Sequence, residues 1–217
     1  CDDMLTTTVF ATKAPKLVLC GAGSDKDVLA LQVFFLAHMQ QDMAHQHLFR
    51  WHFATTHTFI GIDVVNVKSA ADMAEAVAAR SEESDIVVMC SAVADYTPTH
   101  YSAQKVKKSD GELSIPLART TDILHTLGMK KKEGQMLVGF SMETENLIEN
   151  SRKKLSKKNA DIICANTIAD GGATGFAVDT NQVTLITETE VITLPLCTKE
   201  VTADLILSHI VELQKEK

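Results

Sequence analysis

Asp85-Ile86-Val87-Val88-Met89-Cys90-Ser91-Ala92-Val93-Ala94-Asp95-Tyr96-Thr97-Pro98 combines a buried strand with the polar residues that follow it directly. The apolar run that ends at Cys90 is typical of a strand in the interior of a parallel sheet. Small residues and one carboxylate come next, which is the layout of a ligand site at the carboxyl end of a sheet strand. This segment therefore predicts an α/β fold with a binding site at Asp95.

Asp95 and a basic cluster that follows it both have two interpretations. A carboxylate at a strand end can orient a ligand, or it can simply start a turn before Pro98. In the cluster Lys105-Val106-Lys107-Lys108, Lys105 and Lys107 share one face of an extended segment. Such lysines could close over a phosphorylated ligand, although a solvated run of charge is the common alternative.

Strand and helix signals alternate through most of the chain, as in a sheet of mostly parallel strands. Strands are predicted at 16–20, 60–67, 86–90, 112–116, 135–140, 162–166, 183–187 and 191–194, the last two as a hairpin. Helices are predicted at 25–43, from the cap Ser69 to 80, from Thr120 or Thr121 to 127, at 143–159, and from the cap Thr198 to 212. The pattern predicts a Rossmann-like, three-layer α/β/α fold with a small β-hairpin and loop region.

Composition excludes several classes of protein. The 217 residues are 45% hydrophobic and 23% charged, as in ordinary globular proteins, and the net charge of −7 argues against nucleic acid as a partner. The five cysteines are widely spaced and predict reduced thiols in a cytoplasmic protein. No apolar run is long enough for a membrane helix. Because the chain begins with Cys1, we expect it to be a piece of something longer.

Other candidate binding residues lie on a helix end and a glycine loop. The helix dipole alone favours lysines at a helix end, but Lys154 and Lys158 share a face and could reach a triphosphate. Gly21-Ala22-Gly23-Ser24 could cradle phosphate, although a plain tight turn is the stronger interpretation. The five histidines of residues 38–57 lack a carboxylate or cysteine partner, so no metal ligands are predicted. No motif for a covalent nucleophile is present.

Several blocks in order along residues 60–217 resemble bacterial phosphopantothenoylcysteine synthetase, the synthetase half of the bifunctional coenzyme A biosynthesis flavoprotein. The blocks are Ala92-Val93-Ala94-Asp95-Tyr96, Gln104-Lys105-Val106-Lys107-Lys108, Asp122-Ile123-Leu124, Val138-Gly139-Phe140-Ser141-Met142-Glu143-Thr144-Glu145-Asn146, Lys153 to Asn159, Ile163-Cys164-Ala165-Asn166 and Gly175-Phe176.

This resemblance implies a ligase that joins 4′-phosphopantothenate to L-cysteine. The nucleotidyl group of CTP is first transferred to the carboxylate, releasing pyrophosphate, and the cysteine amine then attacks the acyl cytidylate. Magnesium and lysines would stabilise the charge on the leaving pyrophosphate. The resemblance also implies a homodimer, for which residues 99–118 are a candidate surface, and it makes FMN an unlikely cofactor for this chain.

The same resemblance implies roles for individual residues. Lys105 would assist formation of the acyl cytidylate. The nucleotide contacts would come from Cys90, Ser91, Asp95, Lys105, Thr120, Thr121, Asp122, Ile123, Phe140, Lys154 and Lys158. The family usually has Asn-Pro at Thr120 and Thr121, so this turn departs locally from the family pattern.

Residues 1–58 depart from the family more seriously. Residues 1–20 resemble the end of the flavin decarboxylase domain, residues 21–58 resemble neither half, and the family's glycine-rich opening segment is missing. We expect a deletion or a shift of reading frame to have joined this atypical segment to a synthetase domain at 59–217. The alternative is then a non-catalytic nucleotide-binding or dimerisation remnant. A weaker alternative is an NAD(P)-dependent oxidoreductase. This chain lacks the third glycine of the dinucleotide-binding fingerprint that such enzymes carry.

Overall fold

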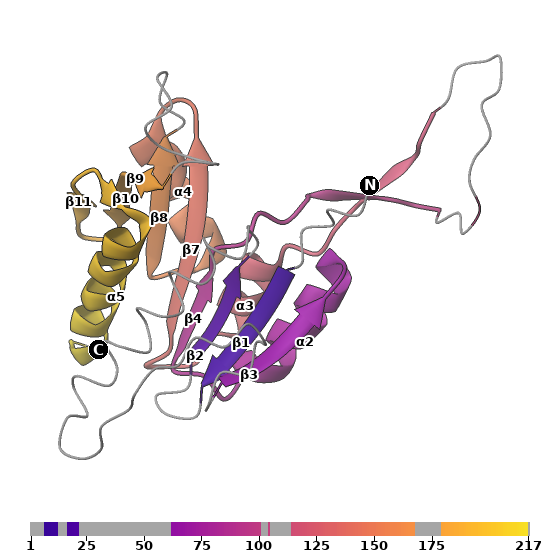
Figure 1. The fold of residues 1–217 in the computed structure, drawn as a ribbon, viewed down its shortest axis with the longest axis horizontal. Coiled ribbons are helices and arrows are strands. Elements are labelled where there is room, and N and C mark those ends of the chain that lie inside the picture. The colour runs from indigo at the N-terminus through magenta and orange to yellow at the C-terminus, as the bar shows by residue number, and fades with distance from the viewer. Residues whose placement is uncertain are drawn as a thin grey trace.

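A computed structural model describes residues 7–12, 17–21, 62–100, 104, 114–167 and 179–216. Within these ranges the central sheet contains eight strands. They are β1 (Thr7–Thr12), β2 (Leu17–Gly21), β3 (Ile62–Val67), β4 (Ile86–Met89), β7 (Met136–Glu143), β8 (Ile162–Thr167), β10 (Val183–Ile186) and β11 (Val191–Thr193). Their order is β11-β10-β8-β7-β4-β2-β1-β3 (Figure 1).

The centre of the sheet is parallel and both sides are antiparallel. Strands β2, β4, β7 and β8 run parallel, whereas β1 and β3 continue the sheet beyond β2, and β10 and β11 continue it beyond β8. All of β4 and the first half of β7 are buried, which explains their uninterrupted apolar sequences. The predicted α/β fold is confirmed, and the sheet is mixed around a parallel core.

Helices α2 (Ala70–Ser81), α3 (Ile123–Lys130), α4 (Leu147–Lys158) and α5 (Lys199–Lys215) cover the sheet. The predicted caps of two of them are confirmed. Ser69 and Asp72 form a capping box at α2, in which the Ser69 N–H donates to Asp72 Oδ2 at 3.0 Å. Thr198 caps α5 by accepting a hydrogen bond from the Val201 N–H.

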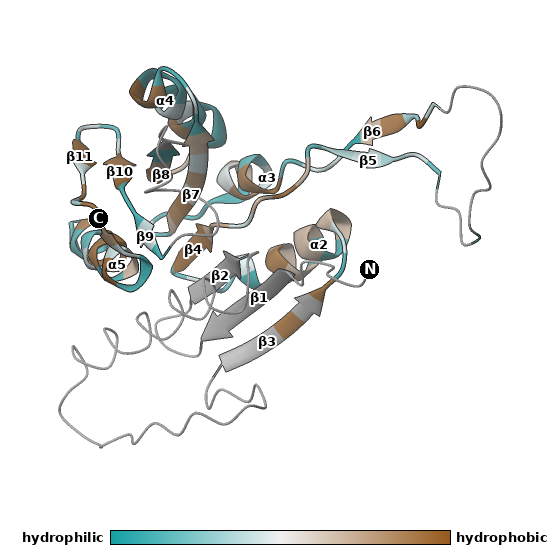
Figure 2. Ribbon diagram, turned by 45° about the horizontal axis from the view of Figure 1, so that its top comes forward, coloured by the Kyte–Doolittle hydropathy of each residue, from teal (hydrophilic) through white to brown (hydrophobic). Residues whose placement is uncertain are grey.

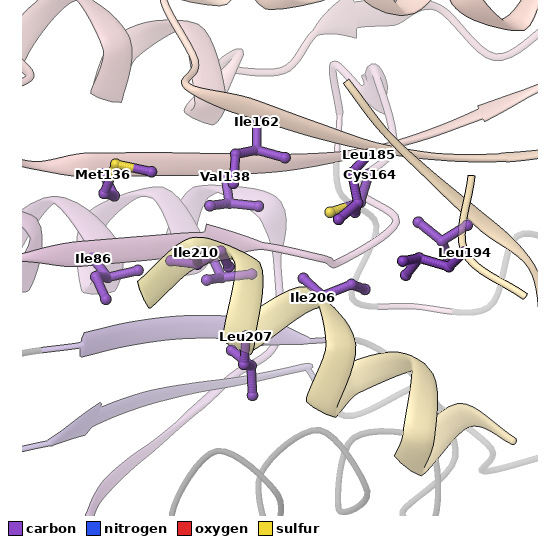
Figure 3. Close-up of a cluster of buried hydrophobic side chains, with 12 residues drawn as sticks. Ile86, Met136, Val138, Ile162, Cys164, Leu185, Leu194, Ile206, Leu207 and Ile210 are labelled. Carbon is purple, nitrogen blue, oxygen red and sulfur yellow. The ribbon is translucent and has the colours of Figure 1, made fainter. Parts of the chain in front are cut away.

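The helices form two layers, one on each face of the sheet (Figures 1 and 2). On one face α5 buries Ile206, Leu207 and Ile210 against alternate residues of the central strands (Figure 3). On the other face α2, α3 and α4 pack in the same way, and their buried residues include Met73, Val77, Ile123, Leu127 and Leu155. The predicted three-layer α/β/α arrangement is confirmed.

Two glycines allow α3 to pack unusually close to its neighbours. A Cβ at Gly139 of β7 would lie 2.5 Å from a side-chain carbon of Leu124. A Cβ at Gly128 of α3 would lie 1.8 Å from the carbonyl oxygen of Lys158, at the end of α4. Because neither glycine has a side chain, α3 lies directly against both β7 and the end of α4.

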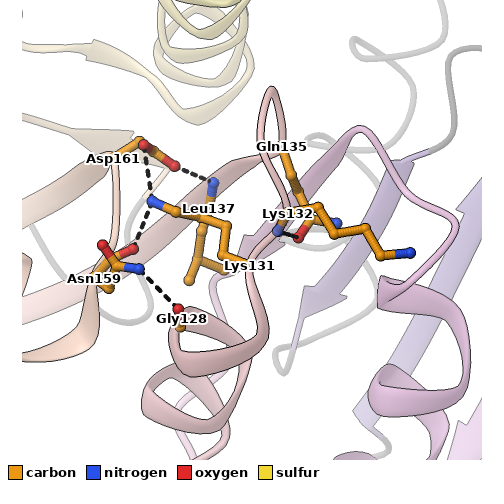
Figure 4. A network of polar contacts seen from close by, with 7 residues as sticks. All are labelled: Gly128, Lys131, Lys132, Gln135, Leu137, Asn159 and Asp161. Carbon is orange, nitrogen blue, oxygen red and sulfur yellow. Dashed lines mark hydrogen bonds and ion pairs between the residues drawn. The ribbon is translucent and has the colours of Figure 1, made fainter.

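A polar network joins these elements at the amino edge of the parallel strands (Figure 4). Lys131 Nζ donates to Asp161 Oδ1 at 3.0 Å and to the Asn159 carbonyl oxygen at 2.7 Å. The second carboxylate oxygen of Asp161 accepts the Leu137 N–H at 2.7 Å, and Asn159 Nδ2 donates to the Gly128 carbonyl oxygen at 2.8 Å. The network therefore fixes the ends of α3 and α4 to the starts of β7 and β8.

Strands β5 (Tyr96–Pro98) and β6 (Leu117–Arg119) form a two-stranded ribbon that extends away from the main sheet (Figure 2). The strand predicted at 112–116 is wrong, since residues 114–116 are not in a strand and 112–113 lie outside the described residues. The strand falls at 117–119 because its partner is Tyr96–Pro98, far away in sequence. A second small sheet, β9 (Thr180–Asn181) with β12 (Cys197–Thr198), was not predicted.

The helix predicted at 143–159 begins later in the structure than the sequence predicted. Glu143 still belongs to β7, where it pairs with Thr167 of β8, and Asn146 adopts a left-handed conformation with φ 50° before α4 begins at Leu147. Strand pairing therefore extends β7 beyond the predicted end at residue 140. Strand β1 has no counterpart in the sequence-based prediction, and the helix predicted at 25–43 lies outside the described residues.

Cys90, Cys164 and Cys197 are not in disulfides, and Cys164 is fully buried. Among the described helices, none is long and apolar enough to cross a membrane.

Candidate functional site

The carboxyl ends of β4, β7 and β8 meet at one edge of the sheet. The register aligns Met89 with Gly139, and Phe140 with Cys164, so Cys90 continues the row beside Phe140. Ligands bind at this edge in open α/β sheets. The described residues predicted to contact nucleotide lie at this edge or on α3 and α4 behind it.

Cys90, Ser91 and Phe140 form the part of the edge next to α5. Cys90 and Phe140 pack against the core on the α5 face. Burial raises the pKa of the Cys90 thiol to about 12, so it is protonated at neutral pH. The hydroxyl of Ser91 is buried and has no hydrogen-bond partner in the described part of the chain. A neutral thiol and a free hydroxyl favour ligand binding over nucleophilic chemistry at these two residues.

Asp95 and Thr120 meet at the base of the β5–β6 ribbon. The Thr120 N–H donates to the Asp95 carbonyl oxygen at 2.9 Å, and the Thr120 hydroxyl donates to the Ala94 carbonyl oxygen at 2.6 Å. These contacts use the backbone of Asp95 and leave its carboxylate exposed. Two predicted nucleotide contacts that are distant in sequence are therefore neighbours in the fold.

Helix α3 begins one or two residues later than predicted, because its cap is Asp122 and not Thr121 or Thr120. Asp122 Oδ1 accepts the His125 N–H at 3.1 Å, and Asp122 Oδ2 accepts a hydrogen bond from Lys158 Nζ. The Thr120 hydroxyl is already used at the ribbon base. Of the other two predicted residues, Thr121 is exposed and Ile123 is buried in the core.

The Asp122–Lys158 ion pair is the first of two lysine–carboxylate pairs at the site. Burial by itself raises the pKa of Asp122, but the hydrogen bonds from Lys158 and from the His125 N–H, together with the Lys158 charge, lower it below its usual value. The His125 ring also bonds the Lys157 carbonyl oxygen through Nδ1 at 2.9 Å. His125 thus joins the start of α3 to the end of α4, which sequence reasoning missed.

The second pair joins Lys154 to the end of β7. Lys154 Nζ lies 2.6 Å from Glu143 Oε1 and 2.9 Å from Ser141 Oγ. Glu143 also accepts hydrogen bonds from the Ser141 hydroxyl at 2.6 Å and from Asn150 Nδ2 at 3.3 Å. Sequence reasoning included Ser141 and Glu143 in a resembling block but gave them no role. Their two-residue spacing at the end of a strand was the available signal, because it puts both on one face.

Lys154 and Lys158 lie on the same face of α4, as their spacing predicted, yet each contacts a different carboxylate. No hydrogen bond or ion pair within the described residues joins either lysine to Asp95. The predicted catalytic Lys105, residues 22–24 of the glycine loop and the histidine-rich segment lie outside the described residues. In the ranges that are described, no group of three or more His, Cys, Asp or Glu side chains could hold a metal ion.

The sequence of residues 41–213 matches the family described as DNA/pantothenate metabolism flavoprotein C-terminal domain. This match covers most of the chain and begins upstream of the boundary predicted at residue 59.

Two curated relatives are similar over part of their length. The chain is 50% identical over 123 residues to the coenzyme A biosynthesis bifunctional protein CoaBC of Bacillus subtilis (strain 168), covering 57% of this chain and 30% of that protein. It is 45% identical over 147 residues to a cysteine/cysteine sulfinic acid decarboxylase of an unknown prokaryotic organism, covering 67% of this chain and 41% of that protein. The chain therefore spans less than half the length of either relative.

Among solved structures, the crystal structure of the C-terminal domain of the coenzyme A biosynthesis bifunctional protein CoaBC is similar to this chain throughout. The two share 32% sequence identity with a TM-score of 0.63, and the similarity covers 98% of this chain and 94% of that chain.

Proposed function

The chain belongs to the family of the DNA/pantothenate metabolism flavoprotein C-terminal domain, and we propose that it is a ligase of coenzyme A biosynthesis. Its substrates in this proposal are 4′-phosphopantothenate, L-cysteine and CTP. The names of the CoaBC relatives support the pathway, and the blocks shared with phosphopantothenoylcysteine synthetase support the reaction.

The observation that best supports the proposal is the arrangement of two lysines beside the ligand edge of the sheet. Lys154 and Lys158 extend from α4 to the end of β7 and the start of α3, respectively. Helical side chains lean toward the helix N-terminus, so both ammonium groups lie closer to this edge than their backbones do. Cations held at the end of β7 and the start of α3 suit a polyphosphate whose charge increases during the reaction.

The proposed reaction has two steps. A carboxylate oxygen of 4′-phosphopantothenate first bonds to the α-phosphorus of CTP, and the bond from that phosphorus to pyrophosphate breaks. The cysteine amine then attacks the acyl carbon, a C–N bond forms, CMP leaves, and the amine loses a proton. Activation is needed because a carboxylate does not condense with an amine in water.

The proposal gives roles to four of the predicted residues. Lys105, Lys154 and Lys158 stabilise the leaving pyrophosphate, and Lys105 assists the first step. The Ser91 hydroxyl supplies a hydrogen bond, since it has no partner among the described residues. Magnesium enters as part of the substrate, bound to the nucleotide phosphates, which is its usual mode in nucleotide sites.

A homodimer is part of the proposal. The side chains of Tyr96 and Leu117 on the ribbon, and of Ile115 beside it, are 50%, 56% and 60% exposed. Exposed apolar residues that gather on one projecting element are typical of an interaction surface.

The test is a reaction of the purified chain with 4′-phosphopantothenate, magnesium and either CTP or ATP, with and without cysteine. We expect pyrophosphate release and a ligated product with CTP, and Lys105→Ala should abolish both. Pyrophosphate release without ligated product would favour a remnant that keeps only the first half of the reaction. Absence of both signals in the unmodified chain would contradict the ligase proposal.

A further inference from the structure

Glu143 lies at the end of β7 in an unusually complete set of contacts. Its side chain is 12% exposed and receives hydrogen bonds from Lys154, Ser141 and Asn150. Burial by itself raises the pKa of the Glu143 carboxyl, but the hydrogen bond and charge of Lys154 and the hydrogen bonds of Ser141 and Asn150 together lower it. The carboxylate is therefore ionised and fixed by donors from both β7 and α4.

The hydrogen-bond donors of Lys154 show that one N–H remains for a ligand. A lysine ammonium group has three N–H donors and no acceptor. One donor faces Glu143 Oε1 and a second faces Ser141 Oγ. The third donor remains, and the Lys154 side chain is 44% exposed although Glu143 is largely buried. The ammonium group is thus held on its protein side and accessible on the other.

We propose that Glu143 is a positioning residue, which holds the Lys154 ammonium group so that its remaining N–H points at the phosphates of a bound nucleotide. Ser141 assists by contacting both members of the pair. This inference rests on the proposed function, because it assumes that Lys154 contacts the nucleotide. A flexible lysine in its place would lose side-chain entropy on binding.

A neighbouring pair on the same helix supplies a matched control. Lys153 Nζ lies 2.7 Å from Glu149 Oε1, and these side chains are 69% and 67% exposed. The chemistry and distance resemble those of Lys154 and Glu143, but both partners lie on the solvent face of α4. Of these two pairs on α4, Lys154–Glu143 is the one anchored to the ligand edge.

The test compares Glu143→Gln, Lys154→Gln and the double variant with the unmodified chain, using isothermal titration calorimetry with CTP and with inorganic triphosphate. Each single variant should weaken binding of both ligands by about tenfold. The double variant should bind no more weakly than Lys154→Gln alone, because Glu143 acts through Lys154. Glu149→Gln and Lys153→Gln should leave both affinities unchanged.

The outcomes separate this inference from the proposed function. If the unmodified chain binds CTP and Glu143→Gln binds it equally well or more tightly, the positioning role is wrong and the ligase proposal stands. Glu143-dependent binding of inorganic triphosphate without binding of CTP would support the positioning role and contradict CTP as the substrate. Absence of binding to either ligand would contradict both.

Ser141→Ala tests the same role if Glu143→Gln lowers the melting temperature below the assay temperature. This variant removes the hydroxyl that contacts both members of the pair and should weaken triphosphate binding about threefold. A folded Ser141→Ala protein with unchanged affinity would overturn the inference.

Discussion

The role of a single residue at this site depends on the residues packed against it, and Gly128 is an example. The closest approach of α3 to the end of α4 occurs at this glycine, which also accepts the Asn159 side-chain hydrogen bond through its carbonyl oxygen. The residue has no direct part in binding. Its role is to bring Asp122 of one helix within reach of Lys158 of the other.

Gly128→Ala should therefore destabilise the protein strongly. The added Cβ would lie 1.8 Å from a backbone oxygen, so one helix must move. We expect the free energy of unfolding to fall by about 2–3 kcal/mol in urea titrations. Met129→Ala, at a 73% exposed position of the same helix, should change it by less than about 0.5 kcal/mol. Equal effects of the two changes would contradict the close-approach argument.

The low pKa of Glu143 makes a prediction about acid stability. A carboxyl whose pKa is lower in the folded state stabilises the protein above its unfolded pKa, about 4.3, and loses that contribution as the pH falls through the folded value. Glu143→Gln should cost about 1–3 kcal/mol of unfolding free energy at pH 7. The difference from the unmodified chain should shrink below about pH 4.3 in urea titrations across pH 3–7. A constant difference across that range would show that ionisation of Glu143 has no part in stability.

Many of the candidate site residues could be predicted from the sequence. The contacts that could not be predicted have physical causes. The lysine pair on α4 and the acid at Asp95 follow from spacing within one element. The partners of these lysines do not, because Glu143 and Asp122 meet them only through packing between elements. The cap of α3 was misassigned for a similar reason, since the Thr120 hydroxyl bonds Ala94, which is distant in sequence.

Helices and strands are held in position by contacts at both edges of the sheet. At the amino edge, Asp161 accepts hydrogen bonds from Lys131 and from the Leu137 backbone, and both charged side chains are less than 15% exposed. The site residues Asp122 and Glu143 lie at the opposite ends of α3 and β7, whereas Lys158 lies next to Asn159 at the same end of α4. A change at Asp161 should therefore shift α3 and α4 as rigid bodies.

Asp161→Ala is expected to lower the free energy of unfolding by roughly 2–4 kcal/mol, because it leaves a buried cation and a backbone N–H without their partner. Amide hydrogen exchange at Leu137 should accelerate as well. Lys153→Gln, which breaks an exposed ion pair, serves as the control and should change neither measurement. Unchanged exchange at Leu137 in Asp161→Ala would argue against the network.

The elements that sequence predicted correctly are those with a strong local period. Strand β4 and helix α2 are examples, the first as an apolar run and the second from its cap at Ser69. Strands β1 and β6 were missed or misplaced because both are specified by pairing with distant segments. The threonine-rich sequence of β1 has little apolar alternation, and its partners are β2 and β3.

The protein as a unit combines a covered sheet with a projecting ribbon. Helices cover both faces of the parallel strands, whereas the ribbon and its approach expose Tyr96, Ile115 and Leu117. This contrast localises the proposed dimer contact to one part of the surface. Other described apolar residues, such as Met129 and Leu196, are exposed as well, but they lie outside the ribbon.

Leu117→Asp should shift the protein from dimer to monomer, measured by sedimentation equilibrium. A charge placed in an apolar contact loses its water on association, so the dissociation constant should rise at least about tenfold. Met129→Asp adds the same charge at another exposed apolar position and should leave the mass unchanged. A monomeric unmodified chain, or a Leu117→Asp protein that stays dimeric, would remove this surface from consideration.

The two hydrogen bonds of Thr120 at the ribbon base also bear on how the proposed ligase could be re-engineered. They fasten the chain after β6 to the carbonyl groups of Ala94 and Asp95 before β5. The spacing between these two chain segments is consequently set by local bonds and does not depend on the length of the connection that joins the two ribbon strands. Grafting a longer or shorter connection there should therefore leave the spacing at the base of the ribbon unchanged.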